Sequence, residues 1–162
     1  MKPDDTRELA KKIVSSLKRR GKTLACAESI TGGGLASAIT DIPGSSAAFL
    51  GGIVTYSDDA KSSLLSVDRK MIRAKTAVSE EVALEMAEGV MRKFGSDYAI
   101  STTGVAGPGR AYGQRAGTVW IGIAVKKGSS HAIALQLSGD RKEVRHATVE
   151  SALASFARIL SR

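Results

Sequence analysis

The sequence predicts one α/β domain built in three layers, a mixed β-sheet flanked by helices. Short apolar segments alternate along the chain with segments of helical periodicity, which is the pattern of a sheet covered by helices. Near the end, two apolar segments are separated by a short glycine-containing turn at 126–129, and such a hairpin makes the sheet mixed rather than purely parallel. The 162 residues suffice for one core, so we expect a single domain over residues 1–162.

The first half of the chain begins with a predicted amphipathic helix over 4–20. Leu9, Ile13 and Leu17 share one face of that helix, and Gly21 is placed to end it. A short apolar segment then runs into a glycine-rich turn at 32–34, as in a strand, turn and helix unit. The further elements expected in this half are a strand over 23–27, a helix over 35–40, a strand over 49–56 and a short helix over 58–65.

The second half carries clearer helix boundaries. Ser79 can cap a helix that reaches Phe94, where Gly95 ends it, and Asp140 can cap the last helix, over 141–160. Glycines and a proline prevent regular structure in the loop 104–109. The strands expected in this half lie over 97–103, 118–125 and 131–137.

Composition excludes several classes of protein. No apolar run approaches the roughly 18 residues that a membrane span requires, and the first residues lack the basic tip and apolar stretch of a secretory signal. Cys26 is the single cysteine, so no internal disulfide can form, and no Cys or His cluster has metal-ligand spacing. We therefore expect a cytoplasmic protein without membrane association, metal or cofactor, and we expect Cys26 in the core.

The formal net charge is +8, from 24 basic and 16 acidic residues, which raises the question of a nucleic-acid partner. The basic residues are scattered along the chain, and aromatic residues, which could stack on bases, make up 4% of it. The distribution therefore argues against nucleic acid. A small anionic substrate explains a positive field equally well.

Three loops follow predicted strands, at Ser29, Tyr56 and Thr103, and in an α/β sheet such loops converge on one crevice. Ser29 could attack a carbonyl while nearby amides stabilise the oxyanion, or Ser29 and Thr31 could bind a phosphate beside the amides of the next helix. A plain helix cap is the third interpretation of Ser29.

A serine nucleophile needs a base, and neither histidine is well placed for that role. His131 begins a predicted strand and His146 lies in the last helix. A buried lysine with a lowered pKa is an alternative base, and Lys61 lies just beyond the strand that leads to Tyr56. Spacing alone favours the other interpretation, in which Lys61 is a solvated helix lysine.

Two further positions suit a ligand. Thr103 and Gly104 end a predicted strand, so the threonine hydroxyl could face the crevice, although a simple turn explains the same residues. Arg141 falls in the first turn of the last helix, where its charge opposes the helix dipole, and this placement is easier to understand if Arg141 serves an anionic ligand.

Taken together, these segments closely resemble the CinA C-terminal family, whose members include nicotinamide-nucleotide amidases. The segments that carry the resemblance cover essentially the whole chain: 27–33 (AESITGG), 49–56 (FLGGIVTY) with Lys61, 78–83 (VSEEVA), 102–108 (TTGVAGP), 117–122 (GTVWIG) and 139–141 (GDR). The resemblance implies that Ser29 is the nucleophile and that Tyr56 and Lys61 activate it. It also implies that Thr103 and Arg141 are active-site residues.

Two departures from the family pattern concern the substrate. Asp58 stands where the family commonly has Asn, and 110–115 (RAYGQR) replaces a stretch of the Gly-Gly-Thr-Pro type. We expect both to affect substrate affinity more than the fold. In this family a molybdopterin-binding-like domain often precedes the C-terminal domain. The 162 residues leave no room for it, so we expect the stand-alone form.

The resemblance implies a metal-free amidohydrolase that converts nicotinamide mononucleotide to nicotinate mononucleotide and ammonia through a serine ester. Amides around Gly32 and Gly33, or the Thr103 loop, would hold the oxyanion, and Arg141 or another cation would meet the phosphate. Two alternatives stay open, a catalytically silent nucleotide-binding module and a basic accessory protein of DNA uptake or repair. We also expect a homo-oligomer, since a small domain can complete a crevice across a symmetric interface.

Overall fold

A computed structural model describes residues 3–162 and contains one five-stranded mixed sheet. The strand order is β2-β1-β3-β4-β5, in which β2, β1 and β3 run parallel and β4 is antiparallel to both of its neighbours. The strands are β1 Leu24–Glu28, β2 Phe49–Val54, β3 Tyr98–Gly104, β4 Thr118–Val125 and β5 His131–Gln136. The predicted α/β class with a mixed sheet is therefore confirmed.

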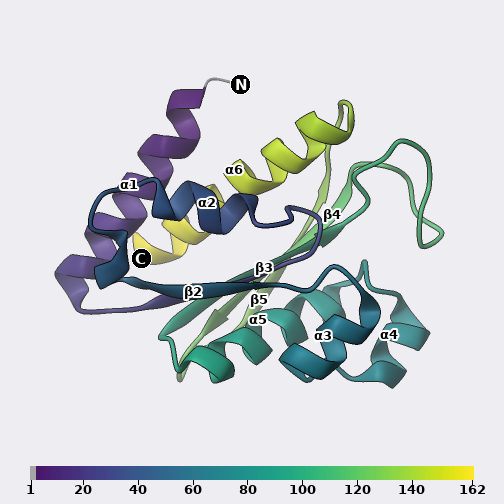
Figure 1. Ribbon diagram of the computed structural model, residues 1–162, viewed down its shortest axis with the longest axis horizontal. Coiled ribbons are helices and arrows are strands. Elements are labelled where there is room, and N and C mark those ends of the chain that lie inside the picture. The colour runs from purple at the N-terminus through teal and green to yellow at the C-terminus, as the bar shows by residue number, and fades with distance from the viewer. Residues whose placement is uncertain (1–2) are drawn as a thin grey trace.

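Helices cover both faces of this sheet, as Figure 1 shows. One face carries α1 Pro3–Arg20, α2 Gly34–Thr40 and α6 Arg141–Leu160, and the other carries α3 Asp58–Leu65, α4 Arg69–Lys75 and α5 Glu80–Phe94. A 3-10 turn, η1 Ser45–Ala47, precedes β2. Each face has its own apolar core. Cys26 and Ile100 point into the α1, α2 and α6 side, whereas Ala25 and Ala99 point into the other, as the alternation of side chains along a strand requires.

Helix boundaries follow the predicted caps. The Ser79 hydroxyl accepts a hydrogen bond from the Val82 amide, and Gly95 ends α5 in the left-handed conformation. Asp140 and Glu143 form a capping box at the start of α6. None of the described helices is both long and apolar enough to cross a membrane.

Apart from shifts of one residue at the ends of strands and helices and the unpredicted turn η1, the structure differs from the prediction at two places. Helix α4 was not predicted, because in its seven residues only Ile72 is buried and no apolar stripe marks it. Strand β2 ends at Val54 rather than at Tyr56. The chain leaves the sheet there, although the Thr55 amide still bonds the Glu28 carbonyl.

The topology brings several segments to one edge of the sheet. Strands β1, β2 and β3 are parallel, so their carboxyl ends meet at that edge, and the residues that follow them lie close together. Strand β5 runs in the same direction as β3, and α6 therefore begins at the same edge. Ser29, Tyr56, Thr103 and Arg141 are positioned by this arrangement.

Candidate active site

A serine and a buried lysine meet at the carboxyl edge of the sheet. The Lys61 ammonium nitrogen lies 3.0 Å from Oγ of Ser29 and donates a second hydrogen bond to the Thr55 carbonyl at 2.8 Å. Ser57 caps α3 by accepting from the Ala60 amide, which fixes Lys61 in the first turns of that helix. The Lys61 side chain is fully buried, so the solvated-lysine interpretation does not hold.

Burial changes the chemistry of Lys61. Loss of solvation lowers the pKa of its amine below the ordinary value, while the nearby negative charge of Asp58 opposes that shift by raising the pKa. A lysine with a lowered pKa is neutral in a larger fraction of molecules. The neutral amine has a lone pair, so the same 3.0 Å contact then allows the Ser29 hydroxyl to donate its proton to Lys61.

Ser29 opens onto a crevice of about 230 Å³. Of the residues that the sequence singles out, those that line this crevice are Ser29, Tyr56, Thr103, Gly104 and Arg141. The remaining wall comes largely from the loop 105–112, together with Ala77 and Val78. Neither His131 nor His146 lines it.

Tyr56 and Arg141 form one side of the crevice and are linked to each other. An Arg141 nitrogen donates to the Tyr56 hydroxyl at 2.9 Å, and the other terminal nitrogen donates to the Gly107 carbonyl at 2.7 Å. Tyr56 remains 60% exposed, so its hydroxyl stands at the mouth of the crevice, and its hydrogen-bond partner is Arg141 rather than Lys61. The predicted role of Tyr56 in activating Ser29 stays a prediction.

Thr103 contributes to the wall while its hydroxyl is used elsewhere. That hydroxyl donates to the Ala77 carbonyl at 2.7 Å, which ties β3 to the segment before α5, and the residue is almost fully buried. The Thr103 hydroxyl could reach a substrate only as an acceptor or after giving up this bond.

The turn after Ser29 lies behind the nucleophile rather than in the crevice. The Thr31 hydroxyl donates to a Glu28 carboxylate oxygen at 2.6 Å and lies 2.7 Å from the Thr102 hydroxyl. The Gly32 amide donates to the Ser29 carbonyl at 3.2 Å. Thr31, Gly32 and Gly33 are not among the residues that line the crevice, and their predicted substrate contacts stay predictions.

Glu28 is a site-supporting residue that the sequence analysis missed. Its buried carboxylate accepts hydrogen bonds from the Leu35 amide at 2.7 Å and the Ala36 amide at 3.0 Å, in addition to the Thr31 hydroxyl. These are free amides of the first turn of α2, which would otherwise lack partners. A charged residue at the end of an apolar strand, directly before Ser29, was the available signal.

Arg145 is the second residue that was missed. Its guanidinium donates to the Ile30 carbonyl at 3.1 Å and to the Thr31 carbonyl at 3.0 Å, and so ties α6 to the turn that follows Ser29. Gly32 permits this approach, because its φ of +57° suits glycine and an added Cβ would lie 3.2 Å from the guanidinium. The spacing of four residues from Arg141, on one helix face, was the only signal in the sequence.

The described residues offer no group of three or more His, Cys, Asp or Glu side chains that could hold a metal ion. Ser29 lines the crevice, and the buried Lys61 contacts its hydroxyl. A hydroxyl in contact with a buried amine can act as a nucleophile with its base in acyl transfer.

The chain is similar in sequence to curated proteins of two lengths. The chain is 49% identical, over 139 residues that make up 85% of each protein, to one from Enterobacter agglomerans named nicotinamide-nucleotide amidohydrolase PncC. It is 45% identical over 149 residues to a CinA-like protein from Frankia casuarinae, covering 92% of this chain and 34% of that protein. The chain thus spans about a third of the length of several of the curated relatives that it matches.

Solved structures show the same fold. The crystal structure of the competence/damage inducible protein CihA from Agrobacterium tumefaciens superposes with a TM-score of 0.94 at 35% identity, covering 100% of this chain and 99% of that one. The family model described as the CinA C-terminal domain matches residues 6–160. The chain therefore belongs to the CinA C-terminal domain family.

Proposed function

We propose that this protein is an amidohydrolase that converts nicotinamide mononucleotide to nicotinate mononucleotide and ammonia, with Ser29 as nucleophile and Lys61 as base. The observation that carries the proposal is the 3.0 Å contact between the Ser29 hydroxyl and the fully buried amine of Lys61. The name of the relative at 49% identity supports the choice of substrate. The positive charge of Arg141 at the crevice suits the phosphate of a mononucleotide.

The reaction proceeds in two halves. In the first, neutral Lys61 takes the proton of the Ser29 hydroxyl while Oγ attacks the carboxamide carbon, and the protonated amine then gives that proton to the leaving nitrogen. The carbon–nitrogen bond breaks and ammonia departs, which leaves an ester on Ser29. In the second half, Lys61 takes a proton from water as the water oxygen attacks the ester carbonyl. That proton passes to Oγ of Ser29, and nicotinate mononucleotide is released.

The Thr55 carbonyl has a defined part in this scheme. It accepts one Lys61 hydrogen at 2.8 Å and so orients the amine, leaving the lone pair of the neutral form free to face Ser29. Burial of the lysine is required as well. Without it, the amine would stay protonated near neutral pH and could not accept the proton.

The test is a turnover assay on the purified protein in the presence of a chelator. We expect ammonia and nicotinate mononucleotide in equal amounts from nicotinamide mononucleotide. Lys61→Ala should reduce turnover by about three orders of magnitude, whereas Lys70→Ala, which removes an exposed lysine from α4, should leave it unchanged. Activity that the chelator abolishes and zinc restores would contradict the metal-free scheme. A protein that binds the mononucleotide without releasing ammonia would be a silent binding module instead.

A further inference from the structure

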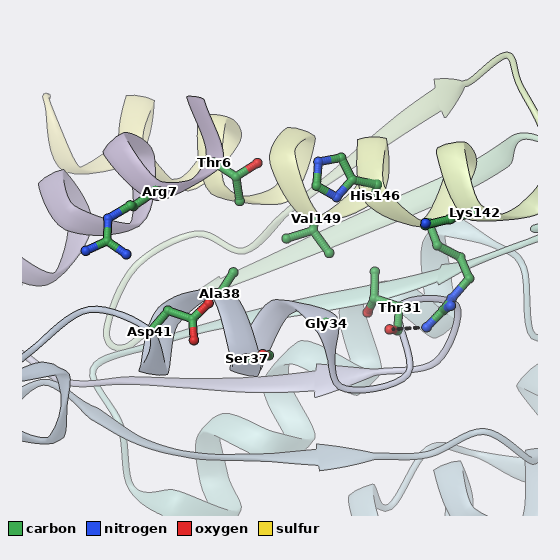
Figure 2. A pocket seen from close by; sticks show the side chains of 11 residues that line it. Thr6, Arg7, Thr31, Gly34, Ser37, Ala38, Asp41, Lys142, His146 and Val149 are labelled. Carbon is green, nitrogen blue, oxygen red and sulfur yellow. Dashed lines mark hydrogen bonds between the residues drawn. The ribbon is translucent and has the colours of Figure 1, made fainter. Parts of the chain in front are cut away.

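A second hollow, of about 440 Å³, lies between α1, α2 and α6 (Figure 2). It is separate from the crevice but shares one structural segment with it. Ser29 and Ile30 line the crevice, whereas Thr31 and Gly34, a few residues further along the chain, line the hollow. The turn that carries the nucleophile therefore borders both spaces.

One end of this hollow is strongly basic. Lys142, Arg145 and His146 come from successive turns of α6 and face α2 across the space. Figure 2 shows Asp41, the one carboxylate of the lining, beside Arg7 at the other end, away from Lys142 and His146. Among the ion pairs of the described residues, none involves Lys142 or Arg145. Within the part of the chain that the structure describes, no carboxylate pairs with the positive charge at this end.

Arg145 is held in place at this basic end. Two of its N–H groups donate to the Ile30 and Thr31 carbonyls, at 3.1 and 3.0 Å, which fixes the plane of the guanidinium. An arginine side chain has five N–H donors, so three remain for a ligand in the hollow. A prepositioned guanidinium loses little side-chain entropy on binding, unlike a free surface lysine.

A hydroxyl group is also available in the lining. Ser37 presents it from α2, where the side chain is exposed. A fixed guanidinium, an ammonium, an imidazole and a hydroxyl donor are groups that bind phosphate oxygens. The volume of the hollow suits a small molecule rather than a macromolecule.

We propose that this hollow is a binding site for a small phosphate monoester, distinct from the catalytic crevice, with Lys142, Arg145 and His146 as the phosphate-recognising residues. Because Arg145 also holds the carbonyls that follow Ser29, the bound ligand contacts the same side chain that positions the nucleophile's turn. An effect of the bound ligand on turnover rests on the proposed amidase function, whereas binding of the ligand does not.

The experiment is an amide-resolved NMR titration of the full chain with ribose 5-phosphate, inorganic phosphate and ribose. We expect both phosphates to shift the amides of Gly34, Ser37 and Thr31 in a saturable manner, and ribose to leave them in place. Tighter binding of ribose 5-phosphate than of inorganic phosphate would show that the sugar also occupies the hollow, and equal binding would assign recognition to the phosphate alone. Both outcomes support the site.

Matched variants complete the test. Lys142→Ala should weaken ribose 5-phosphate binding about tenfold or more, because it removes a charge-assisted contact, while Lys93→Ala, on the opposite face of the sheet, should not. Arg141→Ala should keep the Gly34 and Ser37 shifts. Equal affinities of the Lys142→Ala and Lys93→Ala proteins, or shifts confined to crevice amides such as Gly104, would overturn the proposal. None of these readouts requires amidase activity, so the two proposals can fail separately.

Discussion

Removing the Glu28 carboxylate should destabilise the protein by about 2–6 kcal/mol. In Glu28→Ala the buried Leu35 amide and the partly buried Ala36 amide lose their acceptor, and each unsatisfied buried donor costs about 1–3 kcal/mol. The Thr31 hydroxyl adds little, because it can turn to the Thr102 hydroxyl 2.7 Å away. Against a total stability of roughly 5–15 kcal/mol, such a loss is large.

Equilibrium urea unfolding measures this effect, and two further variants make the measurement specific. Glu28→Gln keeps one acceptor oxygen but places an NH₂ group against either amide, so we expect an intermediate cost of about 1–3 kcal/mol. Glu85→Ala removes a carboxylate that accepts from the Asp68 amide at an exposed position, where water can replace it, and should cost less than about 1 kcal/mol. A Glu28→Ala protein as stable as the Glu85→Ala protein would refute the reasoning.

Three other changes test the site. In Asp58→Asn the acid limb of the pH profile of kcat/KM should move to lower pH. The reason is that the negative charge of Asp58 no longer raises the pKa of Lys61, and turnover needs the neutral amine. An acid limb that stays in place or moves to higher pH would contradict this. Arg141→Ala should reduce kcat/KM for the mononucleotide by about tenfold or more while sparing the dephosphorylated riboside, and an equal loss for both substrates would exclude Arg141 as the phosphate contact. Gly32→Ala should lower the thermal midpoint of unfolding more than Gly21→Ala. Both glycines have a positive φ, 57° and 60°, but only at Gly32 does an added Cβ meet a neighbour, the Arg145 guanidinium at 3.2 Å. An equal drop in the midpoint for both variants would mean that the close approach of Arg145 to Gly32 carries no cost.

The order of elements could be predicted because its signals are local. Capping residues such as Ser79 and Asp140, and glycines such as Gly95, act within a few residues of where they stand, and each ended or began a helix as expected. Helix α4 could not be predicted, because its sequence lacks a clear local signal. Its seven residues carry a single buried apolar side chain, Ile72, which gives no period to detect.

The site could be predicted only in part, because its key contacts join residues far apart in sequence. Lys61 and Ser29 are 32 positions apart. Spacing alone favours a solvated lysine, and only the resemblance to the family predicts that Lys61 activates the serine. The bonds from Arg145 to the Ser29 turn span 115 and 114 positions, and the only signal for them in α6 is the four-residue spacing between Arg141 and Arg145. Thr31 does not line the crevice, and its hydroxyl bonds the Glu28 carboxylate, which lies three residues before it.

The most direct measurement for the central claim is the turnover of Ser29→Ala on nicotinamide mononucleotide, together with its affinity for that nucleotide. If Ser29 is the nucleophile, turnover should fall by about three or more orders of magnitude while binding persists, since Arg141 and the crevice walls remain. The double variant Ser29→Ala, Lys61→Ala should be little slower than either single variant, because the two residues act in one step. A Ser29→Ala protein that keeps wild-type turnover, or whose only defect is weaker binding of the nucleotide, would contradict the account.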